Sequence, residues 1–111
     1  MSNPRDVQVA EPETTTDTDF NVMSDEELEK PYRVILQNDD ITPEDLVTLI
    51  LKTIFELPFT KAHRIMREAH VNGRALVTVL PFEEASARVY RAQSIARTMG
   101  FPLCLYLEPD E

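Results

Sequence analysis

The sequence predicts an α+β fold: a two-layer α/β sandwich in which a small three-stranded antiparallel sheet is covered by three helices, in the order β-α-α-β-α-β. Three observations support this prediction. Short runs rich in β-branched residues alternate with longer segments whose apolar residues recur every three or four positions. Glycine, proline and polar turns separate these segments. The chain has 111 residues, 42% of them apolar, which suffices for one core but not for two.

Residues 1–30 are expected to form a disordered acidic extension. They hold nine acidic residues against two basic ones, a local charge of −7, together with a threonine-rich stretch and few apolar side chains. This composition buries too little apolar surface to offset the entropy lost on ordering. At most a turn of helix is expected, from Ser24 to Leu28. A leader that only keeps the protein soluble would have the same composition.

The first strand and the first helix are expected on either side of a short polar loop. Residues 32–37 have the β-branched character of a strand. Thr42 is expected to cap the following helix, with Pro43 in its first position, and the helix should end near Leu57. The side chains expected to be buried are those of Leu46, Val47, Leu49, Ile50 and Ile54.

The second helix is shorter, and a strand follows it directly. Thr60 is expected to cap this helix, and Gly73 to end it, because glycine accepts the left-handed conformation that terminates helices. Residues 75–80 then form the second strand. The buried side of the helix is expected to consist of Ala62, Ile65, Met66 and Ala69.

A third helix from Phe82 to Met99 and a strand over residues 103–107 complete the order. Acidic residues lead this helix, basic ones follow, and Gly100 ends it. The folded domain is therefore predicted to span residues 31–108, with a short acidic tail at 109–111. The inward side chains of the helix are expected to be Ala85, Val89, Ala92, Ile95 and Met99.

Composition and charge exclude several classes of function. Residues 31–111 carry eleven acidic and nine basic residues, so the folded part offers no basic excess for nucleic acid. No apolar run reaches the roughly 20 residues of a membrane span. The single Cys104 cannot form an intrachain disulfide, which together with the lack of a targeting signal favours the cytoplasm. Cys104 lies inside a predicted strand and is expected to be a buried, inert thiol.

The sequence also lacks the usual motifs of cofactor and metal sites. Only Gly73 and Gly100 are present, so there is no glycine-rich phosphate loop, and no Cys or His pair has zinc-site spacing. No cofactor and no metal are expected, and the protein is not expected to be an enzyme.

Four polar residues are the candidates for chemistry: the strand-end run Asn38, Asp39 and Asp40, and His70 near the end of the second helix. Three interpretations of the run stay open. It is a plain turn, a ligand set for a hard cation such as magnesium, or, with His70, a site for an ammonium group. An amide carbonyl, carboxylates and a neutral imidazole can accept the three hydrogen bonds that an amine donates.

An apolar lining is expected around this polar group. Met66 lies one helical turn before His70 on the same face of the second helix, so a group held at His70 would direct its side chain towards Met66. The alternative is that the same residues are simply core. The lining consists of Val47, Met66, Ala69 and Leu103.

Three stretches of the chain resemble the ClpS family, the N-end rule (N-degron) adaptors of bacterial Clp proteases. They are residues 32–43, YRVILQNDDITP, residues 66–73, MREAHVNG, and residues 102–105, PLCL. The resemblance spans residues 31–108, roughly 70% of the chain. The NDDxTP run, followed about thirty residues later by AHxxG, is a specific combination.

The resemblance implies a binding protein and not an enzyme. ClpS proteins capture substrates that begin with Phe, Tyr, Trp or Leu and pass them to the unfoldase ClpA or ClpC, which feeds the peptidase ClpP. It also implies that the substrate α-ammonium is bound by Asn38, His70 and the acidic pair Asp39 and Asp40, with Asp40 the closer acid. The pocket wall would be formed by Thr42, Glu44, Val47, Met66, Ala69 and Leu103.

The same resemblance implies how the adaptor meets its partner. Glu83 and Arg88, on the third helix, match positions of the surface that docks on the unfoldase. The acidic extension matches the flexible segment that the unfoldase engages during delivery. A monomer is expected, because every apolar stripe is needed for the single core.

Two positions depart from the family pattern, and they leave alternatives open. Glu44 stands where the family often has Met, and Ala69 where it often has Val. Glu44 is either a favourable charge in the first helical turn or an acidic rim that favours a basic second residue or admits branched first residues. Ala69 would widen the pocket. The rival function is an unfoldase-docking module without a working pocket; a small hydrolase using Asp39, Asp40 and His70 would lack a nucleophile.

Overall fold

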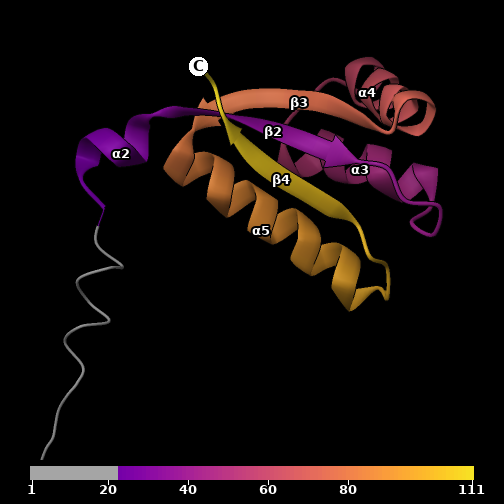
Figure 1. Ribbon diagram of the computed structural model, residues 1–111. Coiled ribbons are helices and arrows are strands. Elements are labelled where there is room, and N and C mark those ends of the chain that lie inside the picture. Colours follow the sequence, from indigo (N-terminus) through magenta and orange to yellow (C-terminus); the bar gives the residue numbers. More distant parts are fainter. Residues whose placement is uncertain (1–22) are drawn as a thin grey trace, which may run out of the picture.

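The computed structural model describes residues 23–111, and within them the expected order of elements is confirmed (Figure 1). Residues 23–111 form four helices and three strands: α2 (Asp25–Glu29), β2 (Pro31–Gln37), α3 (Glu44–Ile54), α4 (Phe59–Asn72), β3 (Arg74–Pro81), α5 (Phe82–Thr98) and β4 (Cys104–Pro109).

The three strands form one antiparallel sheet in the spatial order β3-β2-β4, with β2 in the centre. Ile35 in the middle of β2 pairs with Leu76 of β3 and Tyr106 of β4. The register of β2 and β3 shifts between Val34 and Ile35, because β3 contains one extra residue there. The prediction of a small antiparallel sheet is confirmed.

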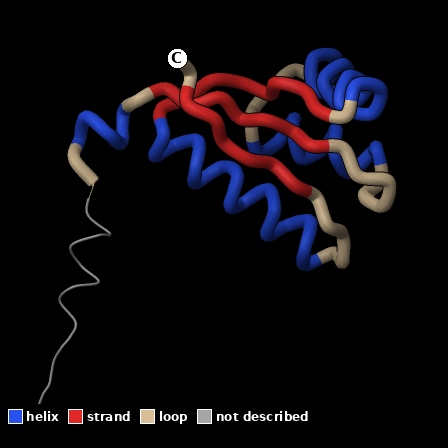
Figure 2. Tube along the Cα trace, viewed as in Figure 1, coloured by secondary structure: helices blue, strands red, loops and turns tan. Residues whose placement is uncertain are grey.

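Helices cover one face of this sheet, so the fold has two layers (Figure 2). Val34 and Leu36 of β2 point into this layer and are buried with residues of α3, α4 and α5. Both α4 and α5 contact the sheet, and α3 packs against these two helices. The α+β two-layer prediction is therefore confirmed, with the short helix α2 as an addition to the three expected helices.

Three residues assigned to buried stripes are exposed instead. Leu49 is 54% exposed, Ile95 40% and Met99 55%. On α5 the buried line runs through alanines, and at about 100° per residue Ile95 lies well off that line. The fully buried positions of this helix are Ala85, Ala92 and Ala96. Small side chains let α5 approach the sheet closely, and the large ones point elsewhere.

The two predicted threonine caps are also wrong. Pro43 and Pro58 occupy the N-cap positions, in extended conformation, and neither helix has a side-chain cap. Thr60 therefore falls inside the first turn of α4, and the Thr42 hydroxyl donates to Asp39 instead. The glycine at the end of α4 is as expected: Gly73 has a φ of 94°, which is left-handed.

At the N-terminal side, the expected turn of helix is present as α2. Ser24 and Glu27 form a capping box, and α2 contacts α5. The rest of the expected extension, residues 1–22, lies outside the described residues. At the other end, β4 continues to Pro109, one residue into the expected tail, and the Asp110 amide donates to the Pro31 carbonyl. The division into extension, domain and tail stays a prediction.

The outer face of the sheet carries charged side chains. Glu108 pairs with Arg33 at 3.0 Å and with Arg74 at 3.2 Å, and Arg74 also donates to the Tyr106 hydroxyl at 2.8 Å. The hydrogen bond from Arg33 lowers the pKa of the Glu108 carboxyl, with the charge of Arg74 adding to it. Cys104, expected to be buried, is half-buried at the start of β4. In the part of the chain that the structure describes, no helix is long and apolar enough to cross a membrane.

Candidate functional site

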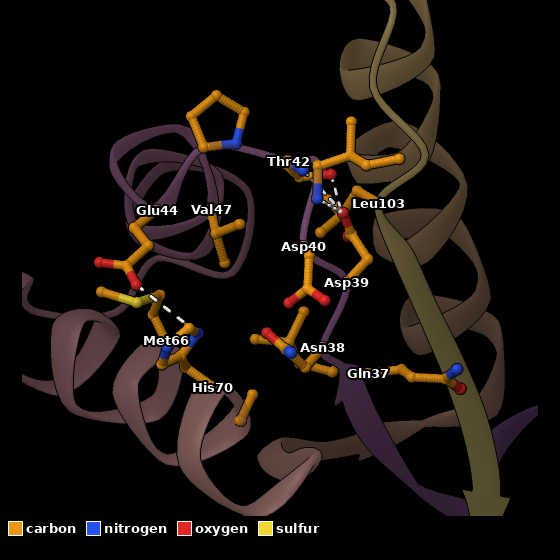
Figure 3. Close-up of a pocket in the computed structure, with 14 residues that line it drawn as sticks. Gln37, Asn38, Asp39, Asp40, Thr42, Glu44, Val47, Met66, His70 and Leu103 are labelled. Carbon is orange, nitrogen blue, oxygen red and sulfur yellow. Dashed lines mark hydrogen bonds and ion pairs between the residues drawn. The ribbon is translucent and has the colours of Figure 1, made fainter.

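A hollow of about 240 Å³ lies where the loop after β2 meets α3, α4 and the start of β4 (Figure 3). It brings together every residue that the sequence assigned to a binding site: Asn38, Asp39, Asp40, His70, Thr42, Glu44, Val47, Met66, Ala69 and Leu103. Four further lining residues were not predicted, namely Leu36, Gln37, Ile41 and Pro43. Leu36 and Gln37 are the last two residues of β2, and Ile41 and Pro43 belong to the loop that follows it.

The rim of the hollow is tied together by the backbone. The Asn38 amide donates to the Gly73 carbonyl at 2.9 Å, which joins the end of β2 to the end of α4. Gly73 in turn ends α4 three residues after His70, and its own amide donates to Ala69 at 2.8 Å. Asn38 and His70 are 32 positions apart in the sequence, and this connection holds them on facing sides of the same opening.

The two acids of the loop have different surroundings. Oδ1 of Asp39 accepts from the Ile41 amide at 2.8 Å and the Thr42 amide at 2.6 Å, and its Oδ2 accepts from the Thr42 hydroxyl at 2.9 Å. Asp40 is exposed, and no hydrogen bond or ion pair among residues 23–111 involves its carboxylate. Its carboxylate and the Asn38 amide point into the gap opposite His70 (Figure 3).

The floor of the hollow is apolar and belongs to the core. Leu103 and Ala69 are each 1% exposed, and Met66 and Val47 are also buried. All four belong to the single hydrophobic cluster that holds the helices on the sheet. The two interpretations of these residues, core or pocket lining, are therefore not exclusive.

Glu44 forms an ion pair at the edge of the opening. Its Oε2 lies 3.2 Å from Nη1 of Arg67 and 3.7 Å from Nδ1 of His70, so it joins α3 to α4. Arg67 was not predicted as a partner, since the sequence only places it on the polar side of α4. The sequence did hold a signal that Arg67 lies at the site: it stands three residues before His70, and residues so spaced are neighbours on a helix.

The arrangement can accept hydrogen bonds from a cationic amine. A carboxylate, an amide oxygen and an imidazole nitrogen face one opening, and an apolar floor lies beneath them. Within residues 23–111, no group of three or more His, Cys, Asp or Glu side chains could hold a metal ion.

The two residues predicted for docking lie elsewhere, on α5. Glu83 is exposed in the first turn of the helix. Arg88 is largely covered: it donates to the Ile54 carbonyl at the end of α3, pairs with Glu84 at 2.7 Å and lies 3.6 Å from Glu56. Arg88 thus already has structural contacts inside the domain, whereas Glu83 is free of them among the described residues.

Known proteins with a similar sequence or structure are Clp protease adaptors. The family described as "ATP-dependent Clp protease adaptor protein ClpS" matches residues 27–106. ClpS 2 of Mesorhizobium japonicum is 40% identical over 100 residues, covering 90% of this chain and 99% of the relative. ClpS 1 of Bradyrhizobium diazoefficiens is 37% identical over 103 residues, covering 93% and 96%.

A solved structure has the same fold. Agrobacterium tumefaciens ClpS2 bound to L-phenylalaninamide superposes with a TM-score of 0.71 at 36% identity, covering 74% of this chain and 99% of that one.

Proposed function

This chain belongs to the ClpS family of Clp protease adaptors, and from that premise we propose that it captures proteins by their N-terminal residue. The substrates are chains that begin with Phe, Tyr, Trp or Leu. The adaptor passes them to a ClpA or ClpC unfoldase, which feeds ClpP. The chain itself supplies binding and no catalysis.

The observation that carries this proposal is the hollow with a polar rim and an apolar floor. Phenylalaninamide, the ligand of the Agrobacterium relative, combines an α-ammonium with an aromatic side chain. The rim of this hollow offers Asn38, Asp40 and His70 to an ammonium, and the floor offers Met66 and Leu103 to a side chain.

Recognition of a chain terminus follows from charge and from hydrogen-bond number. A free α-amino group has a pKa of about 7.7–8.0, so it is mostly cationic at neutral pH and is attracted to Asp40. An internal peptide amide has no charge and a single N–H donor. Anything other than an ammonium would leave rim groups unpaired, at a cost of roughly 1–3 kcal/mol for each buried group.

The floor selects the side chain by size and hydrophobicity. The whole hollow, polar rim included, has a volume of about 240 Å³, against roughly 150 Å³ for an engineered apolar cavity that binds benzene, so one aromatic ring fits. Burial of a Phe or Leu side chain contributes about 1.5–3 kcal/mol. Because the rim and the floor each contribute only a few kcal/mol, both are needed for useful affinity.

A peptide pair tests this proposal. A fluorescent peptide that begins with Phe should bind, and its N-acetylated twin should bind at least tenfold more weakly, because acetylation removes the charge and two of the three donors. Binding is followed by fluorescence anisotropy. If the protein binds an unfoldase but neither peptide, it is a docking module without a working pocket. If either peptide is consumed, it is a hydrolase.

Delivery is proposed to depend on other parts of the chain. Glu83 and Arg88 on α5 would dock on the unfoldase, and the extension over residues 1–30 would be engaged by it. Deletion of residues 1–22 leaves α2 and the pocket in place, so peptide affinity should stay unchanged while degradation of a Phe-initial substrate by the unfoldase and ClpP slows. Unimpaired degradation by the truncated protein would mean that the extension only keeps the protein soluble.

A further inference from the structure

We infer that Asp39 is a positioning residue that holds the loop in shape, which leaves Asp40 as the acid of the pair that meets the ligand. This inference rests on the proposed capture of an α-ammonium. It departs from the expectation that both carboxylates bind the ammonium.

The side chain of Asp39 pairs every backbone N–H donor between Asp40 and the start of α3. The backbone offers two N–H donors there, those of Ile41 and Thr42, since Pro43 has none. Both end on Oδ1 of Asp39, at 2.8 and 2.6 Å. The Thr42 hydroxyl donates to Oδ2 of Asp39 at 2.9 Å, and Thr42 itself is only 7% exposed. Three of the roughly four lone-pair sites of this carboxylate therefore accept hydrogen bonds from within the loop.

Among residues 23–111, no other group accepts a hydrogen bond from the Ile41 or Thr42 amide. The N-cap of α3 is Pro43, which makes no side-chain cap bond, so the helix start does not fix the loop. The other anchor is the bond from the Asn38 amide to Gly73, which lies on the opposite side of Asp39. The hydrogen bonds of Asp39 close the backbone from residue 39 to residue 42 into a ring. Asp40 lies in this ring, and its carboxylate points into the opening with no bonded partner among residues 23–111 (Figure 3).

Isosteric substitutions separate the two roles. In Asp39→Asn the side-chain oxygen still accepts from both backbone amides, and the new NH₂ can donate to the Thr42 hydroxyl. The charge is lost but the ring is kept. In Asp40→Asn the shape is also kept, but the charge that faces the ammonium is removed. Charged hydrogen bonds are about twice as strong as neutral ones, so only the second change should weaken binding strongly.

The experiment compares three variants with the parent protein for a Phe-initial peptide, with the N-acetylated twin as background. Asp39→Asn should bind within about threefold of the parent and keep its salt dependence. Asp40→Asn should bind roughly tenfold more weakly or worse, with a flatter salt dependence. Asp39→Ala, which opens the ring, should also lose at least tenfold. Rescue of the alanine variant by asparagine distinguishes positioning from charge.

Amide hydrogen exchange in the free protein gives a second measurement that does not need a ligand. The amides of Ile41 and Thr42 should exchange faster in Asp39→Ala and at the parental rate in Asp39→Asn and Asp40→Asn. Equal losses of binding in the two asparagine variants, or unchanged exchange in Asp39→Ala, would overturn the inference. If the parent binds both peptides alike, the proposed function fails, while hydrogen exchange still decides the role of Asp39.

Discussion

The two ends of the sheet differ in how their functional residues are held. At one end, where β2 passes into the loop, the rim residues are fixed by bonds within the loop and to Gly73, and the floor beneath them is core. At the other end, where Pro31 pairs with Pro81 and α5 begins, the proposed docking residue Glu83 is exposed. β2 has seven residues, so roughly 20 Å separate the ends.

This difference indicates that capture and delivery can be altered separately. A substitution in the rim or at Glu83 changes a surface and should leave the fold intact. A substitution in the floor changes the pocket and the core together. The predictions below test this separation, starting with the largest expected effect.

Leu103→Ala should reduce both stability and binding. Leu103 is 1% exposed and lines the hollow, so its truncation leaves a void that costs about 2–5 kcal/mol in the free energy of unfolding. Leu105→Ala is the matched control, because Leu105 lies two residues further on, inside β4, and is 3% exposed but does not line the hollow. Urea denaturation should give similar losses, whereas peptide affinity should fall clearly only for Leu103→Ala. Equal loss of affinity would mean that the floor acts through stability alone.

Glu83→Lys should affect delivery alone. Reversal of one exposed charge at the edge of an interface changes the association rate, and a several-fold weaker binding to the unfoldase is expected. Glu68→Lys, an equally exposed position on α4, controls for the change in net charge. Surface-immobilised unfoldase reports the association, and anisotropy should show unchanged affinity for a Phe-initial peptide. A loss of peptide affinity would break the separation of the two ends.

Ala69→Val should shift the ranking of first residues. Valine adds two methyl groups to the wall, worth on the order of 1.5 kcal/mol, so peptides that begin with Trp should lose up to about tenfold in affinity relative to peptides that begin with Leu.

Glu44→Met removes the ion pair with Arg67 and should alter discrimination against branched first residues. Isothermal titration with peptides that differ only in the first residue measures both effects. A ranking that neither substitution changes would remove the two positions from specificity.

Glu108→Gln should have the smallest effect, and only on acid stability. Arg33 and Arg74 lower the pKa of Glu108 below its value of 4.5 in an unfolded chain, so its ionised form stabilises the fold. This contribution is present above about pH 4.5 and is lost as the pH falls through the lower, folded-state pKa. The variant should be slightly less stable than the parent at neutral pH and equal to it near pH 2, as measured by urea denaturation. A difference that persists at low pH would indicate packing instead.

Much of this architecture could be predicted from local patterns, but individual contacts could not. The buried side of α4 follows from spacing, and Gly73 from its conformational freedom. Thr42 was misassigned because a threonine before Pro-Glu resembles a helix cap. Only the folded loop shows that its hydroxyl donates to the Asp39 carboxylate instead. On α5, alanines and not Ile95 occupy the buried positions. The helix lies close to the sheet, so the size of a side chain, and not its hydrophobicity, decides whether it fits.

The sequence predicted which residues line the site better than it predicted what each of them contacts. All ten proposed residues line the hollow, since motif spacing places them on the loop and on adjacent helix faces. The pairing of Glu44 with Arg67 and the unequal surroundings of Asp39 and Asp40 depend on side-chain geometry across elements. No one-dimensional pattern encodes those distances.

The bond between the Asn38 amide and the Gly73 carbonyl has a kinetic consequence. With both sides of the opening already joined, an arriving peptide finds a finished receptor and need not wait for a conformational change. Its association rate should then lie in the ordinary range of about 10⁵–10⁷ M⁻¹s⁻¹, whichever residue comes first. Good and poor substrates would be told apart by how long they stay, and a short residence time leaves the adaptor ready for the next one.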